Sequence, residues 1–171
     1  MGVLLKNPPV FKIAKTGQII SYVNYDDGYY ETGNPITPRF IDLGNNSIND
    51  RVTGLRWVKD MSGVNGLGFD FVNKYTWANC LTAITALNTA TYLGFSDWRM
   101  PNINEAQTLA DYSTFAPAMY SDFTYQVGDC WSSTTEKVDT TYAFKFSGQW
   151  GTILDDLKTN TNWVRIVRGN R

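Results

Sequence analysis

The stretch "GFSDWRMPNINEAQTLADYS", residues 94–113, decides how the rest of the chain is interpreted. Its Asp, Trp, Arg, Asn and Glu residues form either a polar active site or a structural corner where a loop enters a helix. Pro101 and Asn102 open a helix, and Glu105 stands three positions after Asn102, which is the spacing of a capping box. This pattern favours the corner. The alternative is a catalytic or metal-binding role for Asp97 and Glu105.

A longer helix is predicted upstream of the corner. Thr76 is a good N-cap, and the apolar residues after it recur at the spacing of one helix face. They are Trp77, Cys80, Leu81, Ile84 and Leu87. The helix at the corner has a similar apolar stripe, formed by Ile103, Ala106, Leu109 and Ala110. Both helices are therefore expected to pack one face against a core.

Short extended segments flank the two helices. Residues 17–25, "GQIISYVNY", alternate as a strand does, and "LGNNS" at 43–47 is a turn between two further strands. From residue 130 onward short strands return, separated by turns such as "SGQWG". The order of strands, two helices and antiparallel strands predicts an α+β fold, in which residues 1–50 are a β-rich extension packed on a main domain of residues 51–171.

The composition excludes several classes of function. The 171-residue chain has a formal net charge of −1, so it lacks the broad positive field that nucleic acid binding requires. It has no run of about 18 apolar residues and no visible signal peptide, so we expect no membrane insertion, and export only by another route or after removal of a leader. It contains no histidine, the usual partner of a nucleophile and the commonest zinc ligand. We expect a non-enzymatic protein with no metal or cofactor.

The two cysteines, Cys80 and Cys130, leave two states open. A bridge between them would stabilise the fold by roughly 4 kcal/mol in the chain-entropy model. Two buried free thiols are the alternative, because a single pair makes no disulfide framework. The missing signal-peptide pattern favours free thiols.

Several motifs, taken in order, carry a resemblance to a known family. They are "DRVTGLRWVKD" (50–60), "TWANCLTAITALN" (76–88), "GFSDWRMPNINEAQTL" (94–109), "CWSSTT" (130–135), "YAFKFSGQ" (142–149) and "VRIVRG" (164–169). In order and spacing they resemble the C-terminal domain family of Legionella collagen-like adhesins. The upstream segment is similar to one that often precedes this domain, so the resemblance covers nearly all of residues 15–169.

The resemblance implies a fold similar to that of C-type lectins and of relatives of the formylglycine-generating enzyme. In this C-type-lectin-like fold, two helices pack on small antiparallel sheets, and loops over the C-terminal sheet contact ligands. The resemblance also implies structural roles at the corner, and the strand after residue 130 supplies a core tryptophan. These structural residues are Asp97, Trp98, Arg99, Pro101, Asn102, Glu105 and Trp131.

Two features depart from the family pattern. Many members have a cysteine in the last strand that bridges to the cysteine of the first helix, whereas here Ile166 stands at that position. Sugar-binding C-type lectins that use calcium carry Glu-Pro-Asn or Gln-Pro-Asp tripeptides, and this sequence has neither. Calcium-dependent sugar binding therefore loses its main support.

The candidate ligand-binding surface is the set of turns between the C-terminal strands, because loops on a rigid sheet are where binding residues concentrate. We expect the antiparallel order to bring these turns to one rim. Trp150 either offers its indole to a ligand or folds back onto the core. Asp155 and Asp156 either bind a cation or form a solvated acidic turn. The full set is Thr135, Glu136, Lys137, Asp139, Gln149, Trp150, Asp155, Asp156, Lys158, Asn160 and Asn162.

These features predict a bacterial adhesin or phage-tail binding module, located on the cell surface or the virion, that captures a glycan or protein on a cell surface. Its variable loops are compatible with a protein diversified by a retroelement. One alternative is a structural subunit of a virion or fibre, for which a homo-trimer would be natural. Another is an oxidoreductase similar to the formylglycine-generating enzyme, which needs a metal-binding cysteine pair, whereas Cys80 and Cys130 lie far apart in the chain.

Overall fold

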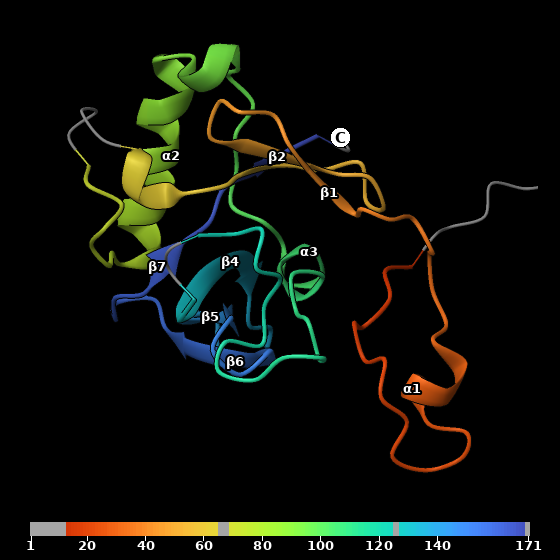
Figure 1. Cartoon of the computed structure of the whole chain (residues 1–171). Helices are drawn as coiled ribbons and strands as arrows, with labels where there is room; N and C mark the ends of the chain where they lie inside the picture. Colours follow the sequence, from red (N-terminus) through yellow and green to blue (C-terminus); the bar gives the residue numbers. More distant parts are fainter. Residues whose placement is uncertain (1–12, 65–68, 125–126, 170–171) are drawn as a thin grey trace, which may run out of the picture.

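The strands form two four-stranded sheets in a computed structural model that describes residues 13–64, 69–124 and 127–169 (Figure 1). The first sheet has the order β1-β2-β3-β8 and is antiparallel throughout. Its strands are β1 (Phe40–Asp42), β2 (Ser47–Asp50), β3 (Arg56–Val58) and β8 (Val167–Arg168). The predicted turn "LGNNS" between β1 and β2 is confirmed, with Gly44 and Asn46 in the left-handed region at φ values of 73° and 63°.

The second sheet has the order β6-β5-β4-β7. Its strands are β4 (Asp129–Thr135), β5 (Tyr142–Ser147), β6 (Thr152–Leu157) and β7 (Trp163–Val164). The prediction of antiparallel strands is wrong for β7, which runs parallel to β4. The reason is the path of the connection. Residues 158–162 pass the start of the long helix, where Tyr75 and Asn162 exchange backbone hydrogen bonds, and return to the beginning of β4 before pairing.

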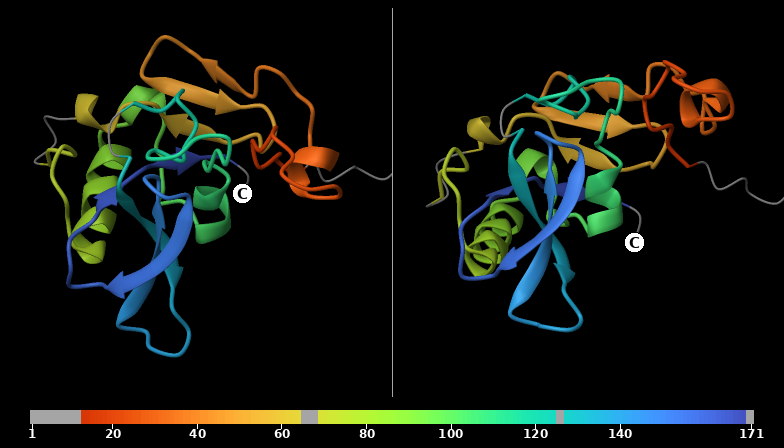
Figure 2. Two further views of the ribbon diagram at one scale, coloured as in Figure 1. Left: turned by 60° about the horizontal axis from the view of Figure 1, so that its bottom comes forward. Right: turned by 90° about the horizontal axis from the view of Figure 1, so that it is seen from below.

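Two helices cover opposite faces of this second sheet (Figure 2). On one face, α2 (Trp77–Thr89) packs Cys80, Ala83 and Leu87 into a buried cluster with Trp131 of β4. On the other face, α3 (Ile103–Gln107) contributes to a second cluster with Phe146 of β5. The mixed α+β class is therefore confirmed.

The predicted stripe of α2 is correct except at Leu81. Thr76 caps the helix by accepting from the Asn79 amide at 3.3 Å. Ala83 lies in the core, whereas Leu81 is 38% exposed, because the buried face turns slightly from the one that the spacing suggested. A short 3-10 turn, η2 (Tyr92–Gly94), follows α2, and another, η1 (Met61–Gly63), precedes it.

The corner at residues 94–113 holds its tryptophan in the core. Trp98 is 1% exposed, and its indole N–H donates to the carbonyl oxygen of Tyr92 at 2.8 Å. The side-chain amide of Asn88 on α2 accepts from the Trp98 N–H and donates to its carbonyl oxygen, both at 2.8 Å. Asn102 and Glu105 form the predicted capping box, which is confirmed.

The same corner fixes the last strand, β8. Arg99 and Val167 exchange two backbone hydrogen bonds of 2.9 Å. The Asp97 carboxylate accepts from the Arg168 guanidinium at 2.7 and 3.2 Å. Arg99 also forms a two-point ion pair with Glu105, in which both N–O distances are 2.7 Å. The charges of the motif are thus used to hold the chain end against the helix.

The remaining predicted structural residues tie the corner to the second sheet. Pro101 is buried, and its carbonyl oxygen accepts from the Ser133 amide at 2.8 Å. Trp131 is fully buried, and its indole donates to the Tyr75 carbonyl oxygen at 3.0 Å. Trp163 on β7, by contrast, is only half-buried, because β7 lies at a sheet edge.

Residues 13–38 form an arm that extends beside the body (Figure 1). The strand predicted at 17–25 is wrong: the segment is irregular and leads into a single helical turn, α1 (Asp27–Tyr30). The alternation exists in the sequence, but among the described residues no strand lies beside it to accept its backbone hydrogen bonds. The predicted boundary between residues 50 and 51 falls within the first sheet, since β1 and β2 precede it and β3 and β8 follow it.

Cys80 and Cys130 are both buried and unbridged. Burial raises the pKa of the Cys80 thiol to about 12 and that of Cys130 to about 11. Both are therefore thiols rather than thiolates at neutral pH. Within the described ranges, no helix is both long and apolar enough to cross a membrane.

Candidate functional site

The predicted binding residues lie at two opposite ends of the second sheet, not at one rim. The strand register pairs Ser147 with Thr152 next to the turn that holds Gln149 and Trp150. It pairs Tyr142 with Leu157 at the other end. Successive turns of adjacent antiparallel strands alternate between the two ends, so β6 separates them by roughly 20 Å at about 3.4 Å per residue. The expectation of a single rim is wrong for this reason.

The first group, which we call the polar end, comprises the loop at 135–141 and the turn at 158–162. Figure 2 shows the loop between β4 and β5 projecting away from the rest of the sheet. At its centre, the Lys158 ammonium donates to the Thr135 hydroxyl and to the Thr140 carbonyl oxygen, both at 2.9 Å. The same ammonium lies 4.5 Å from the centroid of the Trp77 ring. Lys158 is therefore occupied within the protein.

The acidic residues of the polar end are also bonded internally. Glu136 accepts from the Asp139 amide at 2.6 Å, and Asp139 accepts from the hydroxyl of Thr141 at 2.6 Å. Each of these contacts lowers the pKa of its carboxyl group. Lys137 and Asp155 are exposed to solvent. The loop is thus held by its own side chains, and few of the predicted residues are left to face a ligand.

Asp156 is the most heavily bonded of the predicted residues. It accepts from Asn160 at 2.7 Å, from Asn162 at 2.9 Å and from the Lys145 ammonium at 3.1 Å. Lys145 also pairs with Asp129 at 2.9 Å. Burial, the largest influence, raises the pKa of Asp156, but the three hydrogen bonds outweigh it and leave the pKa below its ordinary value. Asn162 is itself 4% exposed, which indicates a structural role.

The second group, which we call the aromatic end, comprises the turn at 148–151 and the loop at 112–117. Trp150 is 52% exposed, and its ring centroid lies 5.4 Å from that of Phe115, which is 79% exposed. Gly151, at φ 68°, allows the tight turn, and its carbonyl oxygen accepts from the Tyr112 hydroxyl at 2.7 Å. Trp150 therefore does not fold back onto the core.

A pocket of about 210 Å³ adjoins the aromatic end. Phe115, Pro117, Met119 and Phe123 supply its apolar walls, and Asp111 and Ser121 supply polar groups. Sequence reasoning missed Phe115, because its partner Trp150 lies 35 positions away by numbering. The local signal is an aromatic residue two positions before Pro117 in a turn-rich stretch, which indicates exposure but not pairing.

Two serine hydroxyls of β4 are bonded to backbone carbonyl oxygens. The Ser132 hydroxyl donates to the Phe144 carbonyl oxygen at 2.7 Å, and the Ser133 hydroxyl donates to the Pro101 carbonyl oxygen at 3.2 Å. In the part of the chain that the structure describes, no three His, Cys, Asp or Glu residues are grouped so that they could hold a metal ion.

Comparison with known proteins identifies the family. No curated protein matches the chain. A family model described as the Lcl C-terminal domain matches residues 46–168, which include the second sheet, the first sheet except β1, both main helices and the corner. The match confirms the resemblance to the C-terminal domain of Legionella collagen-like proteins and makes this an adhesin-related domain of the cell-surface type. The chain belongs to the Lcl C-terminal domain family.

Proposed function

We propose that the chain is a non-catalytic binding module of a bacterial adhesin, and that the aromatic end captures a glycan or a protein on a cell surface. The observation that carries this proposal is the exposed pair of Trp150 and Phe115 beside a pocket. Exposed aromatic rings of this kind supply stacking area to a sugar or an apolar anchor to a protein.

The polar end plays a supporting role in this proposal. Its Lys158 and Asp156 are satisfied by internal hydrogen bonds, so a ligand would have to displace existing partners to use them. Within the described part of the chain, the rings of Trp150 and Phe115 contact each other and make no hydrogen bond that a ligand would have to displace. The proposed binding surface is therefore limited to the aromatic end of the sheet and does not include the whole set of turns. Gln149 is the polar residue next to Trp150 in this surface.

The proposed scaffold is a C-type-lectin-like fold. Its support is the arrangement of two helices on opposite faces of a small sheet, with a second sheet beside it. We further propose binding without calcium or another cofactor, because the sequence lacks the calcium-binding tripeptides. A trimeric state and a place on a phage virion remain compatible with a display module, and the family membership favours the bacterial surface.

The test is a glycan array and a cell-surface binding screen, run on the chain with and without a chelator. Capture should persist with the chelator and should fall by roughly fivefold to thirtyfold in Trp150→Ala, because a single exposed anchor contributes about 1–2 kcal/mol. The matched control is Tyr22→Ala, which removes another exposed aromatic, 81% exposed, from the arm.

Each other outcome has a clear meaning. Equal loss of capture in Tyr22→Ala would show that general surface aromaticity, not the aromatic end, is responsible. Capture that disappears with the chelator would restore a calcium mechanism. Turnover of any arrayed compound would replace the binding module with an enzyme.

A further inference from the structure

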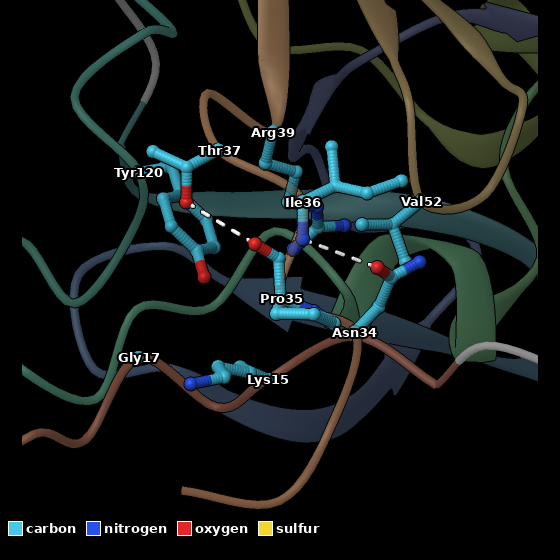
Figure 3. Close-up of a pocket in the computed structure, with 9 residues that line it drawn as sticks. All are labelled: Lys15, Gly17, Asn34, Pro35, Ile36, Thr37, Arg39, Val52 and Tyr120. Carbon is cyan, nitrogen blue, oxygen red and sulfur yellow. Dashed lines mark hydrogen bonds between the residues drawn. The ribbon is translucent and has the colours of Figure 1, made fainter.

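A pocket of about 260 Å³ lies where the arm meets the body (Figure 3). Lys15 and Gly17 of the arm form one side of it. Val52 and Tyr120 of the body line it together with the segment at 34–39, which leads into β1. Because its walls come from segments far apart in the chain, the pocket is complete only while the arm is docked.

The arm is held at this place by specific contacts. The Tyr112 amide of the body donates to the Thr16 carbonyl oxygen at 2.9 Å, and within the arm the Asn34 amide donates to the Ile13 carbonyl oxygen at 2.9 Å. Gly17, at φ 91°, packs directly on Asp111, and a side chain at this position would collide with the Asp111 carboxylate. The pocket is therefore a built feature of the docked arm.

Two polar groups of the pocket have unused hydrogen-bonding capacity. Asn34 is 7% exposed, and its side-chain oxygen accepts from the Ile36 amide at 3.1 Å. Its side-chain nitrogen has no partner among the described residues. The Tyr120 hydroxyl likewise makes no hydrogen bond within the described ranges, and Figure 3 places it on the same side of the pocket as the Lys15 amine. The buried Asn34 side-chain nitrogen requires an acceptor, and the hydroxyl of the half-buried Tyr120 can supply a second hydrogen bond.

The charges that line the pocket are positive. Lys15 and Arg39 line it, and none of the described residues that line it carries a carboxylate. Arg39 is fixed, because its guanidinium forms a two-point pair with Asp50 at 3.1 and 2.6 Å and lies 5.1 Å from the Tyr120 ring centroid. Lys15 forms an ion pair with Glu31 at 3.0 Å, but the two side chains are 34% and 44% exposed. Such a surface pair is weak, so the Lys15 amine can turn to a ligand.

We propose that this pocket binds a small carboxylate of about amino-acid size. The carboxylate group of the ligand would accept hydrogen bonds from the Lys15 ammonium and the Tyr120 hydroxyl. A second acceptor of the ligand would bind the Asn34 side-chain nitrogen. An apolar edge of the ligand would pack on Pro35 and Val52. The volume suits a ligand smaller than those of typical drug-sized pockets, which begin at about 300 Å³. Because the ligand contacts both arm and body, it also stabilises the docked arm.

The experiment titrates the full chain with succinate, N-acetylglycine and glucuronate, and separately with succinamide, glucose and inorganic phosphate. Binding is followed by ligand-observed NMR, and docking of the arm by hydrogen exchange at the Tyr112 amide. We expect saturable binding of at least one carboxylate at millimolar concentration with slower exchange at Tyr112, and no binding of the two neutral compounds. The probes also separate a free organic acid from a peptide-like or sugar-borne carboxylate. Failure of all three carboxylates, or tighter binding of phosphate, would overturn the assignment.

Variants locate the site. Lys15→Met should weaken carboxylate binding by about tenfold or more, whereas Lys59→Met, which removes a similar surface ion pair with Asp42, should leave it unchanged. Asn34→Asp should abolish binding, because it replaces the free donor with a negative charge. Tyr120→Phe, which keeps the ring, should weaken binding without changing thermal stability. Equal loss in Lys59→Met would place the ligand elsewhere. Trp150→Ala should have no effect here, so this proposal and that for the aromatic end can fail independently.

Discussion

Trp98 and Trp150 each follow a polar residue and lie within four positions of a glycine, but one is buried and the other is exposed. Trp98 is 1% exposed with its indole N–H bonded, whereas Trp150 is 52% exposed. The difference lies in the neighbours. The corner surrounds Trp98 with Asn88, Tyr92 and Phe95, whereas the turn at 148–151 places Trp150 against Phe115, which is itself 79% exposed. The composition of a motif therefore does not distinguish a fold-forming tryptophan from a ligand-binding one.

The largest expected effect is at the corner. Trp98→Ala should lower the free energy of unfolding by about 3–5 kcal/mol, because it removes a fully packed aromatic side chain. Denaturant unfolding measures this loss. Trp150→Ala, as the matched tryptophan, should change the same quantity by less than about 0.5 kcal/mol. If the Trp98→Ala variant were stable but no longer captured ligand, the corner would be the binding site and its structural role would be wrong.

The next effect concerns the aromatic end as a pair. Trp150→Ala and Phe115→Ala should each weaken capture, and the double variant should lose less than the sum of the two. The coupling expected from an aromatic pair is about 0.5–1.5 kcal/mol. A double-mutant cycle on the captured ligand measures it. Strict additivity would mean that the two rings act as separate anchors rather than as one surface.

A smaller effect tests the cap of the corner. Asn102→Ala should cost about 1 kcal/mol in the free energy of unfolding, because it removes the side-chain oxygen that accepts from the Glu105 amide. Asn104→Ala, an exposed position on the same helix, is the control and should be nearly neutral. If both variants behave alike, the capping box contributes nothing to the corner.

The smallest effect is a pH dependence at the polar end. The pKa of Asp156 is lower in the folded protein than its ordinary value of 3.8, so its contribution to stability is present above that value and is lost as the pH falls through the folded pKa. Asp156→Asn should therefore cost less than about 1 kcal/mol at neutral pH, and its difference from the unchanged protein should shrink below about pH 4. If the difference in the free energy of unfolding between the two proteins did not change with pH, the charge of Asp156 would not be its cause.

The features predicted correctly from the sequence are those with local signals. Thr76 and the Asn102–Glu105 spacing each place their partner within one helical turn, and the turn at 43–47 contains its own left-handed residues. The failures depend on long-range placement. Nothing local shows that residues 17–25 lack a neighbouring strand, or that the connection at 158–162 returns to the start of β4.

The candidate site failed in a different way. Successive hairpin turns lie at alternate ends of an antiparallel sheet. The separation of Trp150 from Lys158 could therefore have been predicted from the order of the strands in the sequence. The pairing of Trp150 with Phe115 was not, because it requires the loop at 112–117 to cross the end of the sheet. Internal hydrogen bonds explain the rest: residues such as Asp156 are polar and near the surface, yet their partners lie within the protein.

The segment at 163–168 contributes one strand to each sheet, β7 and then β8, and this has a mechanical consequence. A pulling force applied at residue 168 would first load the two-residue pairing of β8 with β3 and the Asp97–Arg168 ion pair. Only after these yield would the tension reach β7 and the second sheet. For a surface adhesin under flow, the corner at Asp97–Arg99 would therefore act as a latch that must open before the aromatic end is distorted.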